Sequence, residues 1–112
     1  MAGGGFSESS RNIHLVDGHR LRAECRNERG DYQASELNLN TCIGNLNGYL
    51  AWDTPNFSQT SQNIRLVENG TKIEATLLQV SGHHSAPQGI YLNDRIVNRN
   101  GCLHFIPHNE IR

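Results

Sequence analysis

The sequence has little of several features that identify large classes of proteins, and cysteine is the first of them. Only Cys25, Cys42 and Cys102 are present, an odd number with wide spacing and no CxxC pair. Small secreted domains more often carry an even number of cysteines joined in a disulfide framework. We therefore expect reduced thiols in this chain.

The sequence also lacks an excess of charge of either sign. Ten Lys and Arg residues against eleven Asp and Glu residues give a net charge of -1. Proteins that bind nucleic acid or anionic membrane surfaces normally show a basic excess or a basic face. The charge balance therefore predicts neither kind of partner.

No long apolar segment is present, and no run approaches the roughly 20 residues that span a bilayer. Residues 1–5 (MAGGG) have neither the basic region nor the apolar region of a secretory signal. These observations predict no membrane insertion and a cytoplasmic location, with release by a non-conventional route as the alternative.

Recognisable catalytic and metal-binding motifs are missing as well. There is no G-x-S-x-G elbow and no P-loop. His104 and His108 have the spacing of helical metal ligands, but Pro107 between them argues against such a helix. His83 and His84 are adjacent, so in a strand they would point to opposite sides. The sequence therefore predicts no metal, no cofactor and no enzymatic activity.

What the sequence does contain is an internal repeat. Residues 6–16 (FSESSRNIHLV) recur as residues 57–67 (FSQTSQNIRLV), and residues 39–52 (LNTCIGNLNGYLAW) recur as residues 92–105 (LNDRIVNRNGCLHF). The two copies cover about residues 5–53 and 56–106. A segment of about fifty residues is near the lower limit for a stable core of its own. We therefore predict that residues 1–112 form a single domain in which two halves share one core.

Within each copy, the local pattern is that of β-strands. Hydrophobic residues alternate with polar ones, and Asp17-Gly18 and Asn69-Gly70 are dipeptides that tight hairpin turns accept. Short helical turns are predicted at residues 41–43, capped by Asn40, and at residues 94–96, after Asn93. No longer helical period is present, so the chain is predicted to be mostly β.

Residues 53–56 (DTPN) link the two copies, and Pro55 stiffens this link. A short, stiff link between similar halves favours domain swapping. We expect a monomer, with a domain-swapped dimer as the alternative. Residues 106–112 are expected to form a loosely held end.

The repeated segments resemble the cyanovirin-N homologue (CVNH) family of small mannose-binding lectins over about residues 5–105. The likeness is carried by Phe6-Ser7, Asn12, Leu39-Asn40, Ile43, residues 45–48 (NLNG), Leu50 and Trp52, and by their second-copy partners Phe57-Ser58, Asn63, Leu92-Asn93, Ile96, residues 98–101 (NRNG), Leu103 and Phe105. The resemblance implies two pseudo-symmetric tandem repeats, each a three-stranded sheet plus a β-hairpin with short 3₁₀ turns. These repeats would be intertwined, by exchange of their hairpins, into one elongated domain.

The resemblance also implies a function. Family members bind mannose-terminated, high-mannose oligosaccharides, especially α-1,2-linked mannose, without a metal ion and without catalysis. The family's prototype has one disulfide in each half, but the matching positions here are Ser10 with Cys25 and Ser61 with Leu77. Neither disulfide can form, so the chain resembles the disulfide-free, mainly fungal members. Cys25 is then expected to be a small buried hydrophobic residue.

Two shallow glycan sites follow from the resemblance, one in each half. The first-half site is carried over to Gly5, Glu8, Ser9, Arg26, Asn27, Glu28, Asn98 and Asn100. The second-half site is carried over to Asn45, Asn47, Asn56, Gln59, Thr60 and Gln79, together with Gly44, Leu78 and Val80. Amides, hydroxyls and carboxylates suit the vicinal hydroxyls of a sugar, which donate and accept side by side. Gly44, Leu78 and Val80 stand where the prototype has charged residues, so we predict that the first-half site is the stronger one.

Some of these residues also have a purely structural interpretation. Asn45, Asn47, Asn98 and Asn100 belong to Asn-Gly turns, where Asn is common for backbone reasons alone. Trp52 could stack on a sugar, but its repeat partner is Phe105 and both end alternating strands, which favours a role in the core.

Two alternative functions remain open. The carboxylates of Glu8 and Glu28 would suit a glycosidase if they lay at the right separation, although a shallow site gives little desolvation to raise the pKa of an acid. A protein-interaction module on the same fold is the other alternative, because folds readily change function.

Overall fold

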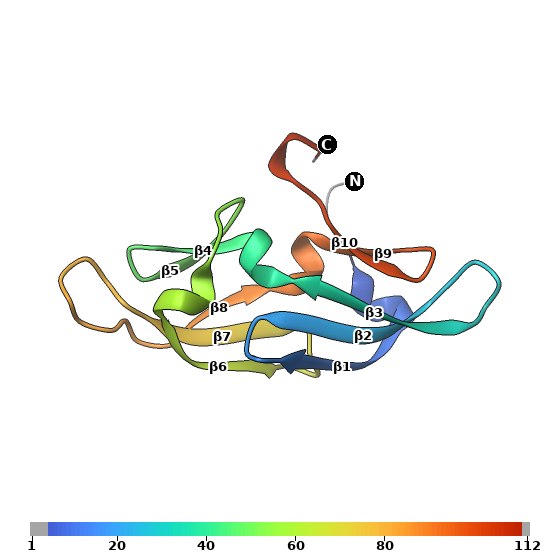
Figure 1. The fold of residues 1–112 in the computed structure, drawn as a ribbon, viewed down its shortest axis with the longest axis horizontal. Helices are drawn as coiled ribbons and strands as arrows, with labels where there is room; N and C mark the ends of the chain where they lie inside the picture. The colour runs from blue at the N-terminus through green and yellow to red at the C-terminus, as the bar shows by residue number, and fades with distance from the viewer. Residues whose placement is uncertain (1–4, 111–112) are drawn as a thin grey trace.

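Two three-stranded antiparallel sheets lie side by side along the long axis of the molecule (Figure 1). The first contains β1 (Ser10–Val16), β2 (Arg20–Arg26) and β3 (Tyr32–Asn38), and the second contains β6 (Ser61–Val67), β7 (Lys72–Leu77) and β8 (Gln88–Tyr91). The structure is a computed structural model that describes residues 5–110. Residues 1–4 and 111–112, which the predicted domain includes, lie outside this range. The described part measures 50 × 29 × 20 Å.

Alternating burial explains why these segments form strands. In β2, Leu21, Ala23 and Cys25 are buried, whereas Arg22 between them is exposed. This period of two places every apolar side chain on the face toward the core. The turn after β1 has positive φ angles at Asp17 (56°) and Gly18 (76°), as expected for a tight turn of this dipeptide.

Two further hairpins are exchanged between the halves. One pairs β4 (Ile43–Leu46) with β5 (Tyr49–Trp52), and the other pairs β9 (Ile96–Arg99) with β10 (Cys102–Phe105). The β4–β5 hairpin follows the first sheet in the chain but lies against the second half, and the β9–β10 hairpin lies against the first sheet (Figure 1). This intertwined, elongated, mostly β architecture with short 3₁₀ turns confirms the predicted fold class.

One hydrophobic cluster includes buried residues from both halves. Phe6 and its repeat partner Phe57 are both fully buried in it. Trp52 packs against this cluster and stacks on Phe105 with ring centroids 5.6 Å apart, which agrees with the predicted role in the core. Because the halves share these contacts, neither half keeps its apolar face covered without the other.

The three cysteines are free thiols, as the sequence predicts. Cys25 is fully buried and lies opposite Ser10 in the ladder of β1 and β2, while Ser61 lies opposite Leu77 in the second sheet. Burial raises the pKa of the Cys42 thiol to about 12, so this group stays protonated at neutral pH. Cys25 and Cys42 therefore pack as small apolar groups, whereas Cys102 is exposed.

The predicted helical turns exist but begin two residues earlier than expected. They are the 3₁₀ turns η2 (Leu39–Thr41) and η4 (Leu92–Asp94). Asn38, not Asn40, caps η2 by accepting a hydrogen bond from the backbone N–H of Asn40. The predicted positions were wrong because Ile43 and Ile96 already begin the strands β4 and β9.

Asn40 and Asn93 instead join the two halves. Asn40 Nδ2 donates to Ser58 Oγ (2.7 Å) while its Oδ1 accepts from the Ser58 N–H (3.1 Å). Asn93 makes the equivalent pair of bonds with Ser7, at 2.6 and 3.0 Å. Both serines belong to 3₁₀ turns that sequence reasoning missed, η1 (Phe6–Ser9) and η3 (Phe57–Thr60). The repeated Phe-Ser and Leu-Asn pairs thus supply core side chains and the bonds between halves.

The prediction of a loosely held end is wrong for residues 106–108. Arg95 and Ile106 exchange two hydrogen bonds of 2.7 Å, and the backbone N–H of His108 donates to Asp53 Oδ1. Arg95 also pairs with both carboxylate oxygens of Asp53 at 2.9 Å. The link between the halves and the chain segment before η5 (His108–Glu110) are therefore held by one carboxylate.

Among residues 5–110, no helix has the length and hydropathy that crossing a bilayer would require.

Replacing Asp53 by Asn tests this carboxylate. Partial burial acts to raise the pKa of Asp53, but hydrogen bonds from Arg95 and from the His108 N–H outweigh it and hold the pKa below the ordinary 3.8. A lowered pKa stabilises the fold above pH 3.8, and this contribution is lost as the pH falls through the folded-state value. Since the side chain is 36% exposed, we expect Asp53→Asn to lower the free energy of unfolding at pH 7 by only about 1–2 kcal/mol.

Urea unfolding of both proteins from neutral to strongly acidic pH checks this expectation. The difference between them should shrink as the pH falls below 3.8. Asp94→Asn is the control, because Asp94 is exposed and its carboxylate has no ion pair within residues 5–110. A difference that does not change with pH would contradict the role given to Asp53.

Candidate functional site

Asn98, near the tip of the β9–β10 hairpin, organises one end of the molecule. Its Nδ2 donates to Ser9 Oγ (2.8 Å) and to the backbone carbonyl of Arg26 (2.9 Å). Its Oδ1 accepts from the backbone N–H of Gly101 at 2.8 Å. One amide therefore connects the hairpin, the end of η1 and the end of β2. Both donor hydrogens of this amide are used inside the protein.

A five-residue loop after β2 completes this end. The Oδ1 of Asn27 accepts from the backbone N–H groups of Arg29 (3.0 Å) and Asp31 (3.1 Å), which closes the loop on itself. Asn100 Oδ1 accepts from the N–H of Glu28 at 2.8 Å and so ties the loop to the hairpin. These are the local side-chain-to-backbone bonds that Asn makes in turns.

Three charged side chains form the open rim of this end. Glu8, Arg26 and Glu28 are exposed, and within residues 5–110 their side chains make no hydrogen bond or ion pair. Gly5 precedes η1 with a φ of 71°, and a Cβ there would lie 3.4 Å from Glu8 Oε2. The structure thus brings all eight predicted first-half residues to one end of the molecule, with polar groups at its rim that are free to bond a ligand.

The β4–β5 hairpin lies at the opposite end of the molecule (Figure 1), where Asn45 is the centre of the same framework. Asn45 Nδ2 donates to Thr60 Oγ1 (2.9 Å) and to the carbonyl of Leu78 (2.7 Å), while its Oδ1 accepts from Gly48 N–H (2.7 Å). Asn47 Oδ1 accepts from the Val80 N–H at 2.9 Å, as Asn100 does from Glu28. The hydrogen bonds of Asn45 and Asn47 therefore match those of Asn98 and Asn100.

The remaining second-half residues lie in the same place. Gln79 packs on the turn of the hairpin, where a Cβ at Gly48 would approach its Cγ to 2.8 Å. Asn56 has a φ of 70° before η3, and the N–H of Gln59 donates to its carbonyl. Gly44 differs from the others because it is buried, and a Cβ there would lie 2.5 Å from Thr54 Oγ1. Gly44 is thus needed for packing and has no surface to offer a ligand.

The rims of the two ends differ in polarity. Leu78 stands where the first end has Arg26, and Val80 where it has Glu28. Leu78 is 38% exposed and Val80 is 89% exposed. Leu46 and Tyr49, on the hairpin at the same end, are both 63% exposed. The second end therefore offers fewer charge-assisted hydrogen bonds and more apolar surface than the first.

The sequence did not predict every residue that helps to form the two ends. Gln33 on β3 accepts a hydrogen bond from Asn27 Nδ2 (3.1 Å) and donates one to the carbonyl of Gly101 (3.2 Å). It therefore connects the loop after β2 to the β9–β10 hairpin. No repeated motif marks Gln33, and its position follows only from strand register. His83 and His84 lie in the loop after β7 and not in a regular strand, and the carbonyl of His83 accepts from Gln79 N–H.

The chemistry available at both ends is polar binding. Within the part of the chain that the structure describes, no group of three or more His, Cys, Asp or Glu residues could hold a metal ion. Glu8 and Glu28 are both exposed to solvent, whereas the acid of a glycosidase lies in a desolvated pocket. Exposed amides, hydroxyls and charges suit a ligand rich in hydroxyl groups.

Comparison with known proteins also indicates a carbohydrate-binding protein. The CVNH domain family matches residues 6–104. The "Cyanovirin-N homolog" of Tuber borchii is 50% identical over 101 residues, which are 89% of this chain and 97% of that protein. The solved structure of this T. borchii CVNH has a TM-score of 0.81 at 48% identity and covers 94% of this chain and 99% of its own.

Two similar structures were solved with sugars. A MoCVNH3 variant in complex with (N-GlcNAc)4 has a TM-score of 0.85 at 30% identity, covering 91% of this chain and 97% of its own. Microvirin in complex with mannobiose has a TM-score of 0.76 at 27% identity, covering 91% and 98%.

Removing the Asn98 amide should destabilise the protein. Asn98→Ala leaves the N–H of the buried Gly101 and the carbonyl of Arg26 without their partner. The exposed Arg26 carbonyl can bond water, but an unpaired N–H in the buried Gly101 costs about 1–3 kcal/mol, so we expect a loss of that size in the free energy of unfolding. Asn45→Ala should lose a similar amount, because Asn45 makes the equivalent bonds.

Urea unfolding measures both effects, with Asn109→Ala as the control at an exposed position in η5. If Asn98→Ala unfolds at the same urea concentration as Asn109→Ala, then Asn98 does not organise this end.

Proposed function

Because this chain belongs to the CVNH family of lectins, we propose that it binds mannose-terminated oligosaccharides at the two ends of the molecule. We propose α-1,2-linked mannose as the preferred unit and high-mannose glycans as the partner. The protein acts by binding and not by catalysis. The chain works as a single monomeric domain, and a dimer formed by exchange across residues 53–56 is the alternative assembly.

The observation that carries the proposal is the arrangement of the predicted residues at each end. Hydrogen-bonded amides hold two loops and a hairpin tip together and leave polar side chains at the rim. Microvirin, which shares the fold, was solved with mannobiose, and this supports a mannose ligand here. The MoCVNH3 variant was solved with a GlcNAc tetramer, which supports glycan binding in general.

The inequality of the two ends supports a ranking of the sites. Each neutral hydrogen bond contributes roughly 0.5–1.5 kcal/mol, and a charge-assisted one about twice as much. Arg26, Glu8 and Glu28 supply charged partners at the first end, where the second end has Leu78, Gln59 and Val80. The first end is therefore proposed as the stronger site. A branched glycan that reached both ends, or several molecules, would gain affinity from multivalency.

The same apolar rim favours a second candidate function at the second end. Leu46, Tyr49, Leu78 and Val80 are exposed there, and exposed apolar groups gathered at one place are typical of protein contacts. A partner that stays bound in the presence of excess mannose would identify a protein-interaction function, whereas displacement by mannose would leave the lectin proposal in place.

Arg26→Ala tests the first site. We expect the dissociation constant for α-1,2-dimannose, measured by isothermal titration calorimetry, to rise about 3- to 10-fold, since one charge-assisted bond is lost. Leu78→Ala is the matched control at the equivalent position of the second end and should leave the tighter dissociation constant unchanged. If Arg26→Ala binds as tightly as the wild type, the assignment of Arg26 to the site is wrong.

Transplanting the charges tests why the ends differ. The double variant Leu78→Arg and Val80→Glu gives the second end the charged residues of the first, at exposed positions where they need not disturb the core. The affinity of the second end for dimannose should then rise several-fold, by the same charge-assisted bonds. NMR titration of the amides near Asn45 measures this site separately. An affinity that does not rise would show that the rim charges do not set the ranking.

A further inference from the structure

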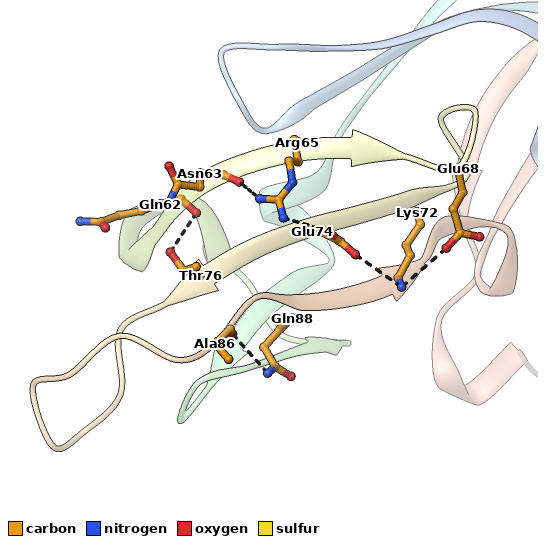
Figure 2. Close-up of polar contacts among 9 residues, drawn as sticks. All are labelled: Gln62, Asn63, Arg65, Glu68, Lys72, Glu74, Thr76, Ala86 and Gln88. Atoms are coloured by element: carbon orange, nitrogen blue, oxygen red, sulfur yellow. Dashed lines mark hydrogen bonds and ion pairs between the residues drawn. The ribbon is translucent and has the colours of Figure 1, made fainter.

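The outward faces of the two sheets differ at a cross-strand pair that lies away from both ends. In the second sheet, Arg65 lies opposite Glu74, and their side chains form an ion pair of 2.9 Å (Figure 2). Arg65 Nη1 also donates to the carbonyl of Asn63 at 2.9 Å. Lys72 continues the line, 3.5 Å from Glu74 and 3.7 Å from Glu68 (Figure 2). Charges of opposite sign thus alternate along this face and satisfy each other.

In the first sheet, the equivalent pair is His14 opposite Arg22. His14 Nδ1 lies 2.7 Å from the carbonyl of Asn12 and donates a hydrogen bond to it. This bond is equivalent to the one that Arg65 donates to the carbonyl of Asn63 in the second sheet. Arg22 has no carboxylate opposite it on β1. It lies opposite Glu36 on β3 instead, and the two form an ion pair in which Nε is 3.7 Å from Oε1, a distance too long for a hydrogen bond. The guanidinium is left with free donors on an exposed surface.

A shallow groove of about 560 Å³ lies at this position. It forms beside the bulge of β1, where Asn12 has a φ of 54° and the strand register shifts between Arg11 and His14. Asn12, His14, Arg22 and Glu24 line the groove, together with the small side chain of Ala34 on β3. The groove thus combines an amide, an imidazole, a guanidinium and a carboxylate.

Arg22 is the cation that lines the groove, and its guanidinium makes no hydrogen bond within residues 5–110. Glu24 is paired with Arg11 at 2.7 Å, and Arg11 also lies 3.8 Å from the centre of the Tyr32 ring. Arg20 is paired with Asp17 at 2.6 Å and lies 3.9 Å from Glu36. Glu36 thus contacts both Arg20 and Arg22 at 3.7 Å or more, and the guanidinium of Arg22 keeps donors that an anion in the groove can bond.

We propose that this groove is a third binding site, which takes an acidic sugar residue. The phosphate or carboxylate of the sugar pairs with the guanidinium of Arg22, whose planar donors match an oxyanion. The ring hydroxyls bond Asn12, the Nε2 of His14 and the remaining acceptor capacity of Glu24. The site is separate from the two ends and does not depend on their binding mannose.

Amide NMR titrations with mannose 6-phosphate, glucuronic acid, methyl mannoside and inorganic phosphate test the proposal. We expect shifts at residues 12–14, 22–24 and 34 with mannose 6-phosphate or glucuronic acid, and none there with methyl mannoside. A response to only one of the acidic sugars identifies which anion is bound. Equal affinity for inorganic phosphate would overturn the sugar assignment, and no shift at about 10 mM acidic sugar would overturn the site.

A double variant, His14→Arg with Arg22→Glu, installs the ion pair of the second sheet. That pair already exists in the second sheet, where Glu74 faces Gly89, whereas position 22 faces Glu36 on β3, so thermal unfolding first checks that the variant folds. We expect the dissociation constant for the acidic sugar to rise at least about tenfold. Arg99→Gln is the control, since it makes the same change in net charge outside the groove and should leave binding unchanged. A folded double variant that binds as tightly as the wild type would overturn the proposal.

Discussion

The side-chain amide of Asn98 holds together segments that lie up to 89 residues apart in the sequence, and the architecture of the molecule's ends depends on this contact. Asn98 reaches Ser9 and Arg26 only because the β9–β10 hairpin crosses to the first sheet. Asn45 makes the same contacts at the other end because its hairpin crosses to the second sheet. Each end is therefore assembled from both halves of the chain. Neither end can form unless the hairpins are exchanged. The Asn40–Ser58 and Asn93–Ser7 pairs fix the halves in the positions that make this possible.

The repeat keeps the framework and lets the surfaces diverge. The bonds of Asn98 and Asn45 recur nearly atom for atom, whereas the exposed side chains around them change from Arg26 and Glu28 to Leu78 and Val80. The same divergence occurs on the sheet faces, where Arg65 and Glu74 neutralise each other but His14 and Arg22 do not. A pseudo-symmetric fold can in this way carry sites of different strength and chemistry, because surface substitutions away from structural contacts cost little stability.

Much of the fold could be predicted from local patterns, because alternation and Asn-Gly or Asp-Gly turns act over a few residues. The resemblance to the CVNH family, and not a local pattern, implied which residues would gather at each end. The positions of the short turns were harder to predict from the sequence. The turn η2 begins at Leu39, whose side chain is buried in the core, and no local pattern marks the burial of a single leucine. The hydrogen bonds of Asp53 with Arg95 and His108 were not predicted, because these partners lie 42 and 55 positions away from Asp53 in the sequence. The sequence likewise could not reveal that the Asn98 amide makes its hydrogen bonds inside the protein, whereas the side chains of Glu8, Arg26 and Glu28 stay exposed.

The central claim is that the two hydrogen-bonded ends bind mannose and that the charged end binds it more tightly. Amide NMR of the labelled wild-type protein during titration with α-1,2-dimannose tests this most directly, because it reports every backbone position at once. We expect shifts around Glu8, Arg26 and Asn100 at low sugar concentration, followed by shifts around Asn47, Thr60 and Gln79 at higher concentration. Shifts that begin at the second end, or none at either end with millimolar sugar, would contradict it.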